Sequence, residues 1–179
     1  MSDIQDACAE SYSRLKHLKL VGEEVGIPWQ TVYVHLKKAG VAVTGDKARY
    51  GGITDRFAAK AEAEFKRLIP SAVDNNETEF QSTIDFDVNG NSVDIKAARL
   101  KSDGRIHRWA YCVSKQRDAA DFFILYAYDG SGEDVLHKFM IPGEIAREKT
   151  TISITATLKS KWADYLISDD GLVEFFNSI

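Results

Sequence analysis

Apolar and polar residues alternate between positions 83 and 98, which predicts a β-hairpin. Asn89-Gly90 lies at its centre and favours a two-residue type I′ turn, because both central positions of that turn need a positive φ. Val88 then pairs with Asn91 beside the turn, and the apolar pairs Phe86 with Val93 and Ile84 with Ile95 share one face, which we assign to the core. The polar face carries the remaining pairs: Asp87 with Ser92, Asp85 with Asp94, and Thr83 with Lys96.

The segments around the hairpin predict an α/β fold. A helix over 55–69 is favoured by its alanine content and by an apolar face of Phe57, Ala61, Phe65 and Leu68. Later runs predict strands over 105–113, 122–128, 136–141 and 152–154, and a closing helix that starts across 162–167. The run 122–128 is almost wholly apolar, as in a central strand buried on both faces. We therefore expect a mixed β-sheet flanked by helices.

The N-terminal segment shows helical spacing instead. It predicts three short helices: one capped by Ser11 or Ser13 and running to residue 18, one over about 20–25 that stops at Gly26, and one from Pro28 to Gly40. We expect a helical module over residues 1–50 and a second domain over 51–179. The junction, 44–56, combines glycines with basic residues, and it is explained equally by a contact with a phosphate backbone or by an ordinary solvated linker.

Composition places the chain among globular proteins, with 44% hydrophobic and 28% charged residues. No apolar run is long enough to span a membrane, and the acidic N-terminus lacks a signal-peptide pattern. We therefore expect a cytoplasmic protein in which Cys8 and Cys112 are reduced, structural thiols. The net charge of -4 conceals an asymmetry, because residues 11–60 carry nine basic and four acidic side chains. A basic N-terminal module joined to an acidic domain suits DNA docking followed by metal chemistry.

Other chemistries lack their residue patterns. The four histidines are scattered, with no pair at the spacing of zinc ligands. No nucleophile elbow is present, and no glycine-rich loop is followed by the lysine of a phosphate-binding loop. Trp109 and Trp162 are expected in the core.

The pair Asp85 and Asp94 carries the strongest chemical signal. Like charges directly opposite each other destabilise a hairpin, whereas a divalent cation between them turns repulsion into coordination. Lys96 points to the same face, where it can orient or deprotonate a water or stabilise a phosphate charge. The alternative is a solvated polar face that tolerates its carboxylates.

Asp85 followed by Asp94-Ile95-Lys96 resembles the core of the PD-(D/E)XK nuclease superfamily, and most closely its small intron-encoded or homing nucleases and its Holliday-junction resolvases. The proline that often precedes the first aspartate is absent here. The resemblance implies a restriction-endonuclease-like fold with Asp85 and Asp94 as metal ligands. It also implies a glutamate on the preceding helix, for which Glu62 fits the pattern better and Glu64 remains the alternative.

Residues 20–41 resemble a helix-turn-helix of the resolvase or regulator type, through Gly22, Gly26, Val32 and Leu36. This resemblance implies that the third helix lies in the major groove of DNA. The side chains expected to contact DNA are Trp29, Gln30, Tyr33, Lys37 and Lys38, with Arg49 of the junction. The alternative is a helical bundle that only packs against the rest of the chain.

Together these patterns predict a DNA endonuclease that depends on Mg²⁺, with Mn²⁺ as a substitute. Asp85 and Asp94 hold the metal, Glu62 supports a ligand or water, and Lys96 assists the nucleophile. Cutting both strands with one small site favours a homodimer or larger assembly, and the family favours a nucleoid-associated or mobile-element-encoded protein. Two alternatives remain: a DNA-binding regulator whose nuclease-like domain is inactive and dimerises, and an assembly domain without a nucleic-acid role.

Overall fold

The structure is a computed structural model that describes residues 3–43, 52–77 and 82–179. The chain forms two compact units, which are considered separately: Met1–Arg56 with Asn76–Ser82, and Phe57–Asn75 with Thr83–Ile179. The predicted boundary between residues 50 and 51, and Arg49 with it, lies outside the described residues. In the described part of the chain, no helix combines the length and apolar character needed to cross a membrane.

Three helices make up the ordered core of the first unit: α1 (Asp3–Leu15), α2 (Leu18–Val25) and α3 (Trp29–Lys38). The predicted start of the first helix at Ser11 or Ser13 is wrong, because α1 begins at Asp3 and buries Cys8 and Tyr12 one turn apart. Gly26 ends α2 with a φ of 75°, a conformation that glycine adopts without strain.

The packing of α3 separates its buried residues from the expected DNA-contacting residues. Val32 and Leu36 are fully buried against Cys8, Tyr12 and Val21. The residues expected to contact DNA are all exposed: Trp29, Gln30, Tyr33, Lys37 and Lys38. Gly22 allows this arrangement, because a Cβ there would lie 2.6 Å from the carbonyl oxygen of Ile27. The helix therefore presents two large aromatic side chains and two lysines outward.

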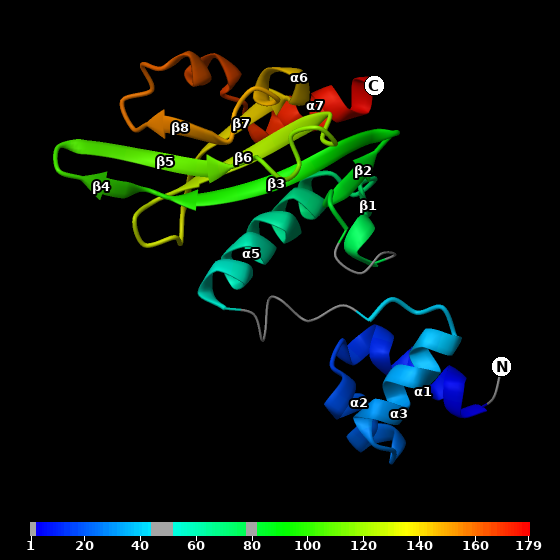
Figure 1. The fold of residues 1–179 in the computed structure, drawn as a ribbon. Coiled ribbons are helices and arrows are strands. Elements are labelled where there is room, and N and C mark those ends of the chain that lie inside the picture. The colour runs from blue at the N-terminus through cyan, green and yellow to red at the C-terminus, as the bar shows by residue number, and fades with distance from the viewer. Residues whose placement is uncertain (1–2, 44–51, 78–81) are drawn as a thin grey trace. The chain divides into compact units, whose positions relative to one another are not determined.

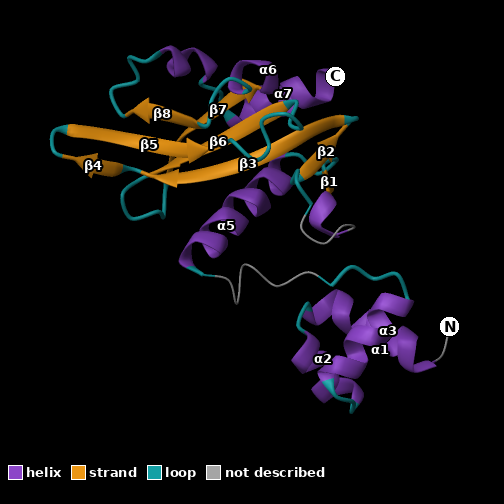
Figure 2. Ribbon diagram, in the orientation of Figure 1, coloured by secondary structure: helices purple, strands orange, loops and turns teal. Residues whose placement is uncertain are grey.

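Two sheets form the second unit (Figures 1 and 2). The larger has the strand order β1-β2-β3-β6-β7, with bounds Val73–Asp74, Phe86–Val88, Asn91–Arg99, Phe122–Tyr128 and Val135–Pro142. Only β3 and β6 are parallel neighbours; the other pairs are antiparallel. The smaller sheet has the order β4-β5-β8, with bounds Lys101–Asp103, Ile106–Cys112 and Thr151–Thr155. The predicted mixed sheet is therefore confirmed.

This unit contains most of α5 (Ile53–Leu68), together with α6 (Gly143–Ala146), α7 (Asp169–Ser178) and a 3₁₀ turn at Lys161–Tyr165; a further 3₁₀ turn, Asn75–Glu77, begins at its last residue before the gap. The predicted start of the closing helix across 162–167 is wrong. A 3₁₀ turn occupies most of that stretch, and α7 begins only after Ser168. The Ser168 hydroxyl accepts a hydrogen bond from the backbone N–H of Gly171. This side-chain cap fixes where the helix starts.

The large sheet is covered on both faces. On one face Val93, Ile95 and Tyr126 pack with Phe65 of α5 and Phe176 of α7. On the other face a separate apolar cluster joins this sheet to the smaller one, through Ala98, Phe123, Leu125, Trp109 and Ile154. Trp109 and Trp162 are buried in this second cluster, as expected. Strand β6 contributes to both clusters, which explains its almost wholly apolar sequence.

The hairpin keeps its predicted register near the turn. The observed pairs are Phe86 with Val93, Asp87 with Ser92, and Val88 with Asn91, and both turn residues have positive φ. The predicted pairing of Ile84 with Ile95 is wrong, because the two side chains pack in different clusters. Pairing between β2 and β3 ends at Phe86.

The backbone before β2 turns away toward a different partner. The N–H of Asn75 donates to the carbonyl of Asp85 at 2.9 Å, and its side-chain amide donates to the carbonyl of Ile84 at 3.3 Å. Asn75 follows β1, the other neighbour of β2. The hairpin is therefore shorter than its sequence pattern indicates, and Asp85 lies just outside the ladder.

Candidate active site

Asp94 is a buried carboxylate in the middle of the large sheet. It lies on β3, and only 1% of its side chain is exposed. Lys96 follows two residues later, on the same face of the strand. Its Nζ lies 2.5 Å from Oδ2 of Asp94, and no other described group donates a hydrogen bond to that oxygen. The carboxylate thus has one charged partner and little water.

The surroundings of Asp94 work against its ionisation. Burial raises its pKa to about 7, and the negative charges of Asp85 and Glu62 also raise it, while Lys96 lowers it. The negative charges of Asp85 and Glu62 therefore add to that of Asp94 itself, and the positive charge of Lys96 opposes them. Such a cluster favours an added positive charge, either a proton on Asp94 or a cation.

Asp85 is held beside this cluster by a bond to the backbone. Its Oδ2 accepts a hydrogen bond from the N–H of Ile95 at 2.8 Å. In a continuous antiparallel ladder that N–H would donate to the carbonyl of Ile84, which here accepts from Asn75 instead. The carboxylate of Asp85 therefore replaces a main-chain acceptor. The predicted direct pairing of Asp85 with Asp94 as ladder partners is not formed, but the charge of Asp85 still acts on Asp94.

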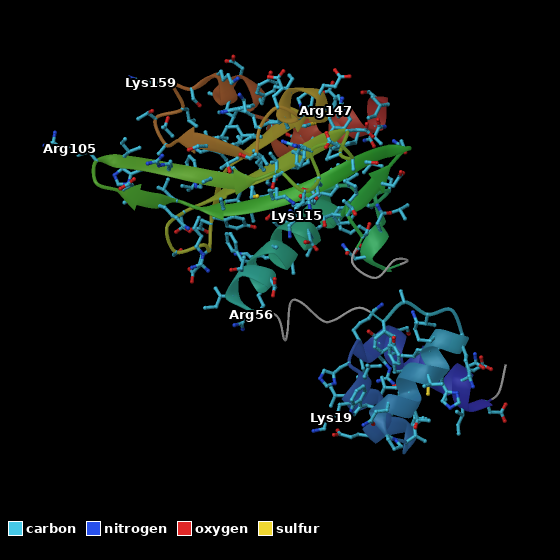
Figure 3. All side chains as sticks on the ribbon, viewed as in Figure 1. Lys19, Arg56, Arg105, Lys115, Arg147 and Lys159 are labelled. Atoms are coloured by element: carbon cyan, nitrogen blue, oxygen red, sulfur yellow. The ribbon has the colours of Figure 1, made fainter. Side chains whose placement is uncertain are left out.

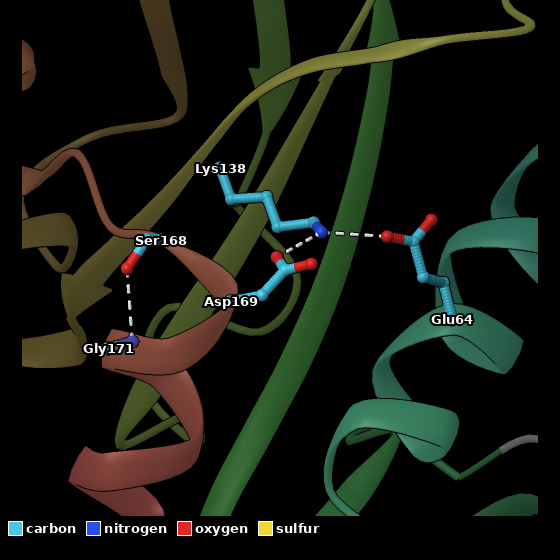
Figure 4. Close-up of polar contacts among 5 residues, drawn as sticks. All are labelled: Glu64, Lys138, Ser168, Asp169 and Gly171. Carbon is cyan, nitrogen blue, oxygen red and sulfur yellow. Dashed lines mark hydrogen bonds and ion pairs between the residues drawn. The ribbon is translucent and has the colours of Figure 1, made fainter.

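The two helix glutamates have different surroundings. The half-buried Glu62 of α5 acts on Asp94 through its charge. Glu64 instead lies 2.7 Å from Nζ of Lys138 on β7, and Lys138 also lies 2.5 Å from Asp169 of α7 (Figure 4). Of the two alternatives left by the sequence, Glu62 is the one whose charge acts at the site.

The donor set fits a hard divalent cation with few protein ligands. Within residues 3–43, 52–77 and 82–179, no three histidine, cysteine, aspartate or glutamate side chains come together as a metal-holding group. The two aspartates therefore remain the candidate ligands. Mg²⁺ is commonly held by one or two carboxylates while it keeps several waters. Oδ2 of Asp94, which has Lys96 as its ion-pair partner, is suited to such a role.

Sequence reasoning missed the surroundings of Cys112 at the end of β5. Cys112 is exposed, so its assignment as a structural thiol is wrong; Cys8 alone is buried. Hydrogen bonds with Ser114 lower the pKa of the Cys112 thiol, and the charges of Lys96 and Lys115 lower it further. The charges of Lys96 and Lys115 thus reach Cys112. No sequence signal shows this, because Lys96 and Cys112 belong to strands of different sheets.

Comparison with known proteins shows a shared fold. One of the solved structures that are similar to this chain is a bacterial protein. It is described as a bacterial homing endonuclease, I-Ssp6803I, and the superposition has a TM-score of 0.51 at 14% sequence identity. The match covers 71% of this chain and 97% of that one. No protein-family model matches the chain, and no curated protein sequence matches it. The chain therefore shares its α/β fold with a protein named as a nuclease, and the PD-(D/E)XK resemblance stays a prediction.

Proposed function

We propose that this protein is a metal-dependent DNA endonuclease with Asp85, Asp94, Lys96 and Glu62 at its active site. The observation that carries the proposal is the buried Asp94 carboxylate, which lies 2.5 Å from Lys96 and under the negative charges of Asp85 and Glu62. A purely structural sheet gains nothing from this arrangement. The fold shared with a structure named as a homing endonuclease supports the same conclusion.

Asp85 and Asp94 would hold the metal, Mg²⁺ or in its place Mn²⁺. When bound, such an ion lowers the pKa of a water and neutralises charge on a phosphate. Lys96 donates hydrogen bonds from Nζ to the attacking water or to a non-bridging phosphate oxygen, which orients the water and stabilises the developing charge. The carboxylate of Glu62 accepts a hydrogen bond from water and holds it on the α5 side of the site.

Recognition would come from the N-terminal unit. The exposed N-terminal half of α3 presents Trp29, Gln30 and Tyr33, and its C-terminal end presents Lys37 and Lys38. Glutamine can bind the edge of adenine in the major groove, and lysines bind phosphates without regard to sequence. We extend the proposal to Arg49 as a backbone contact and to a homodimer that cuts both strands.

Plasmid nicking tests the proposal. Purified protein is incubated with supercoiled plasmid and Mg²⁺, with EDTA as the metal-free arm, and the wild type is compared with Lys96→Ala. Lys101→Ala is the matched control, because Lys101 is an exposed lysine on β4. We expect nicking by the wild type and the control, and none with EDTA or Lys96→Ala. DNA binding without nicking would favour a regulator with an inactive nuclease-like domain, and neither binding nor nicking would contradict the proposal.

A further inference from the structure

The hairpin formed by β4 and β5 extends beyond the rest of its sheet. Strand β8 pairs with β5 only from Cys112 to Arg108, whereas β4 pairs with β5 from Arg108 to Ile106. The hairpin tip, residues 102–107, is therefore a two-stranded ribbon in which no third strand takes part, and every residue of it is exposed. Figure 3 shows Arg105 at the outermost end of the tip, pointing away from the unit.

The base of the hairpin is fixed to the large sheet. The carbonyl of Tyr128, the last residue of β6, accepts two hydrogen bonds from the hairpin: one from the N–H of Leu100 at 3.0 Å and one from Nε1 of Trp109 at 2.7 Å. Trp109 is also buried in the apolar cluster between the two sheets. Both strands are therefore held where the hairpin leaves the sheet, so the fold sets the direction in which the tip projects.

Polar contacts within the hairpin bring its two strands together at the tip. Ser102 Oγ and His107 Nδ1 lie 2.7 Å apart across the ladder. Nη2 of Arg108 donates a hydrogen bond to Oδ2 of Asp103 at 2.9 Å. This ion pair compensates the carboxylate of the tip, so the tip does not present an unbalanced negative charge to an anionic partner.

Two side chains at the end of the tip face solvent. Arg105 has no carboxylate within ion-pair distance in the described part of the chain. Ile106 lies opposite Asp103 in the ladder, and 50% of its side chain is exposed. A two-stranded hairpin without a covered face contributes little to stability. A cation and an apolar side chain at the end of such a projection are suited to contact with another molecule.

The tip projects from the strand that carries the candidate active site. Lys96 lies on β3, which leads through Leu100 into β4. Arg105 follows Lys96 by nine residues, and a fully extended chain spans about 3.6 Å per residue, so the two residues are at most about 32 Å apart. One turn of DNA is about 34 Å long. The tip therefore lies within one turn of a scissile phosphate bound at Lys96.

We propose that the tip of the β4–β5 hairpin enters the major groove of DNA and reads base pairs within one turn of the cleavage position. That groove is about 12 Å wide and admits a two-stranded ribbon, whose strands lie about 4.8 Å apart. Arg105 donates two hydrogen bonds to O6 and N7 of a guanine, and Ile106 contacts the methyl group of a thymine. The inference rests on the proposed nuclease function, and it adds base recognition by the catalytic unit, separate from that by α3.

Sequencing of nicked ends tests this inference in the full chain. The substrate is a plasmid library with a randomised segment, nicked to a low extent in Mg²⁺, and the ends give the frequency of each base at each distance from the nick. We expect the wild type to prefer guanine at a position within one turn of the nick. Arg105→Gln should lower that preference about tenfold and favour adenine at the same position, because glutamine matches the adenine edge. If Arg105→Gln keeps the guanine preference, the base contact is overturned.

Matched variants separate base reading from surface charge. Arg147→Gln makes the same substitution at an arginine whose side chain is 54% exposed and which Figure 3 labels after α6, and it should leave the guanine preference unchanged. Ile106→Ser should lower the preference for thymine beside the guanine severalfold. An equal loss of guanine preference in Arg147→Gln would show an effect of net charge and would overturn the role of the tip.

A binding selection separates failure of this inference from failure of the nuclease proposal. The same randomised segment, as a short duplex in EDTA, is selected by the wild type and by Arg105→Gln, and the bound fraction is sequenced. Nicking with no base preference within one turn would overturn the tip alone. Guanine enrichment that depends on Arg105, without nicking in Mg²⁺, would support the tip and contradict the nuclease proposal. Absence of both binding and nicking would overturn both.

Discussion

Two lysines of the large sheet pair with carboxylates, and the pairs differ in which partner is buried. Lys138 on β7 is itself buried, with 8% of its side chain exposed, and it contacts Glu64 of α5 and Asp169 of α7. At Lys96 the buried partner is the carboxylate of Asp94. The Lys138 cluster connects two helices to the sheet around one cation. At Lys96, one carboxylate contacts the cation, and the charges of Asp85 and Glu62 also act on that carboxylate.

This contrast separates a structural cluster from a chemical one that uses the same residue types. A buried cation with two anionic partners is compensated, so we expect it to contribute to stability. A buried carboxylate on which two further carboxylate charges act is under-compensated, so it favours an added proton or cation. The difference predicts opposite outcomes for substitutions in the two clusters.

The largest expected effect is on catalysis at the Lys96 cluster. Asp94→Asn or Lys96→Ala should lower the nicking rate by about 10²–10⁴-fold, because the first removes a proposed metal ligand and the second removes the donor to the water or the phosphate. Single-turnover nicking measures this, and circular dichroism checks that the fold remains. Lys138→Met is the comparison, and a comparable loss of rate per folded molecule in that variant would remove the distinction between the clusters.

The second effect is a dependence of stability on pH. The pKa of Asp94 is about 7 in the folded state and about 4 in an unfolded chain. Asp94 therefore stays protonated to a higher pH in the folded state than in the unfolded chain. The free energy of unfolding should fall as pH rises from about 4 to 7 and then level off. Urea unfolding at several pH values measures this slope. Asp94→Asn should reduce the slope, and an unchanged slope would show that another group titrates.

A smaller effect concerns the Lys138 cluster. Lys138→Met leaves Glu64 and Asp169 without their cation, so the free energy of unfolding should fall by about 2–3 kcal/mol; the partial exposure of both carboxylates keeps it below the full cost of a broken buried pair. Chemical denaturation measures this value. Lys138→Arg, which keeps the charge, should recover part of it.

The smallest expected effects come from the two glutamates of α5. Glu62→Gln should slow nicking by about tenfold, the low end for one group that orients water, with little change in stability. Glu64→Gln should do the reverse and lower the free energy of unfolding by about 1 kcal/mol. Nicking rates and urea midpoints of the pair are compared directly. Equal effects on both properties would show that the helix glutamates are not distinguished.

The hairpin shows what local sequence could predict. Its register near the turn followed from Asn89-Gly90 and the alternation beside it, because both act within a few residues. The end of the ladder at Phe86 could not be predicted, since Asn75 competes for the backbone of Ile84 and Asp85 from outside the hairpin. The charges of Asp85, Glu62 and Lys96 act on Asp94, whereas the predicted ladder pairing of Asp85 with Asp94 is wrong.

Long-range packing decided the remaining features. Glu62 and Glu64 are both glutamates of one helix, so the helix sequence does not distinguish them. The ion pair of Glu64 with Lys138, on a strand far away in sequence, shows that Glu64 belongs to a different cluster. The proximity of Cys112 to Lys96 depends on how two sheets meet. The start of α1 at Asp3 could not be predicted, since it depends on the burial of Cys8 and Tyr12 in the folded bundle, whereas Ser11 and Ser13 only resemble helix caps.

The bond from the N–H of Ile95 to Asp85 gives this chain a spectroscopic reporter. An amide that donates to a carboxylate experiences the charge of that group directly, so its NMR chemical shift changes when the carboxylate is protonated or engaged by a cation. The Ile95 resonance would then follow occupancy of the site one residue from Asp94, without DNA and without turnover. Titration with Mg²⁺, monitored at a single backbone nucleus, thereby becomes a measurement of affinity.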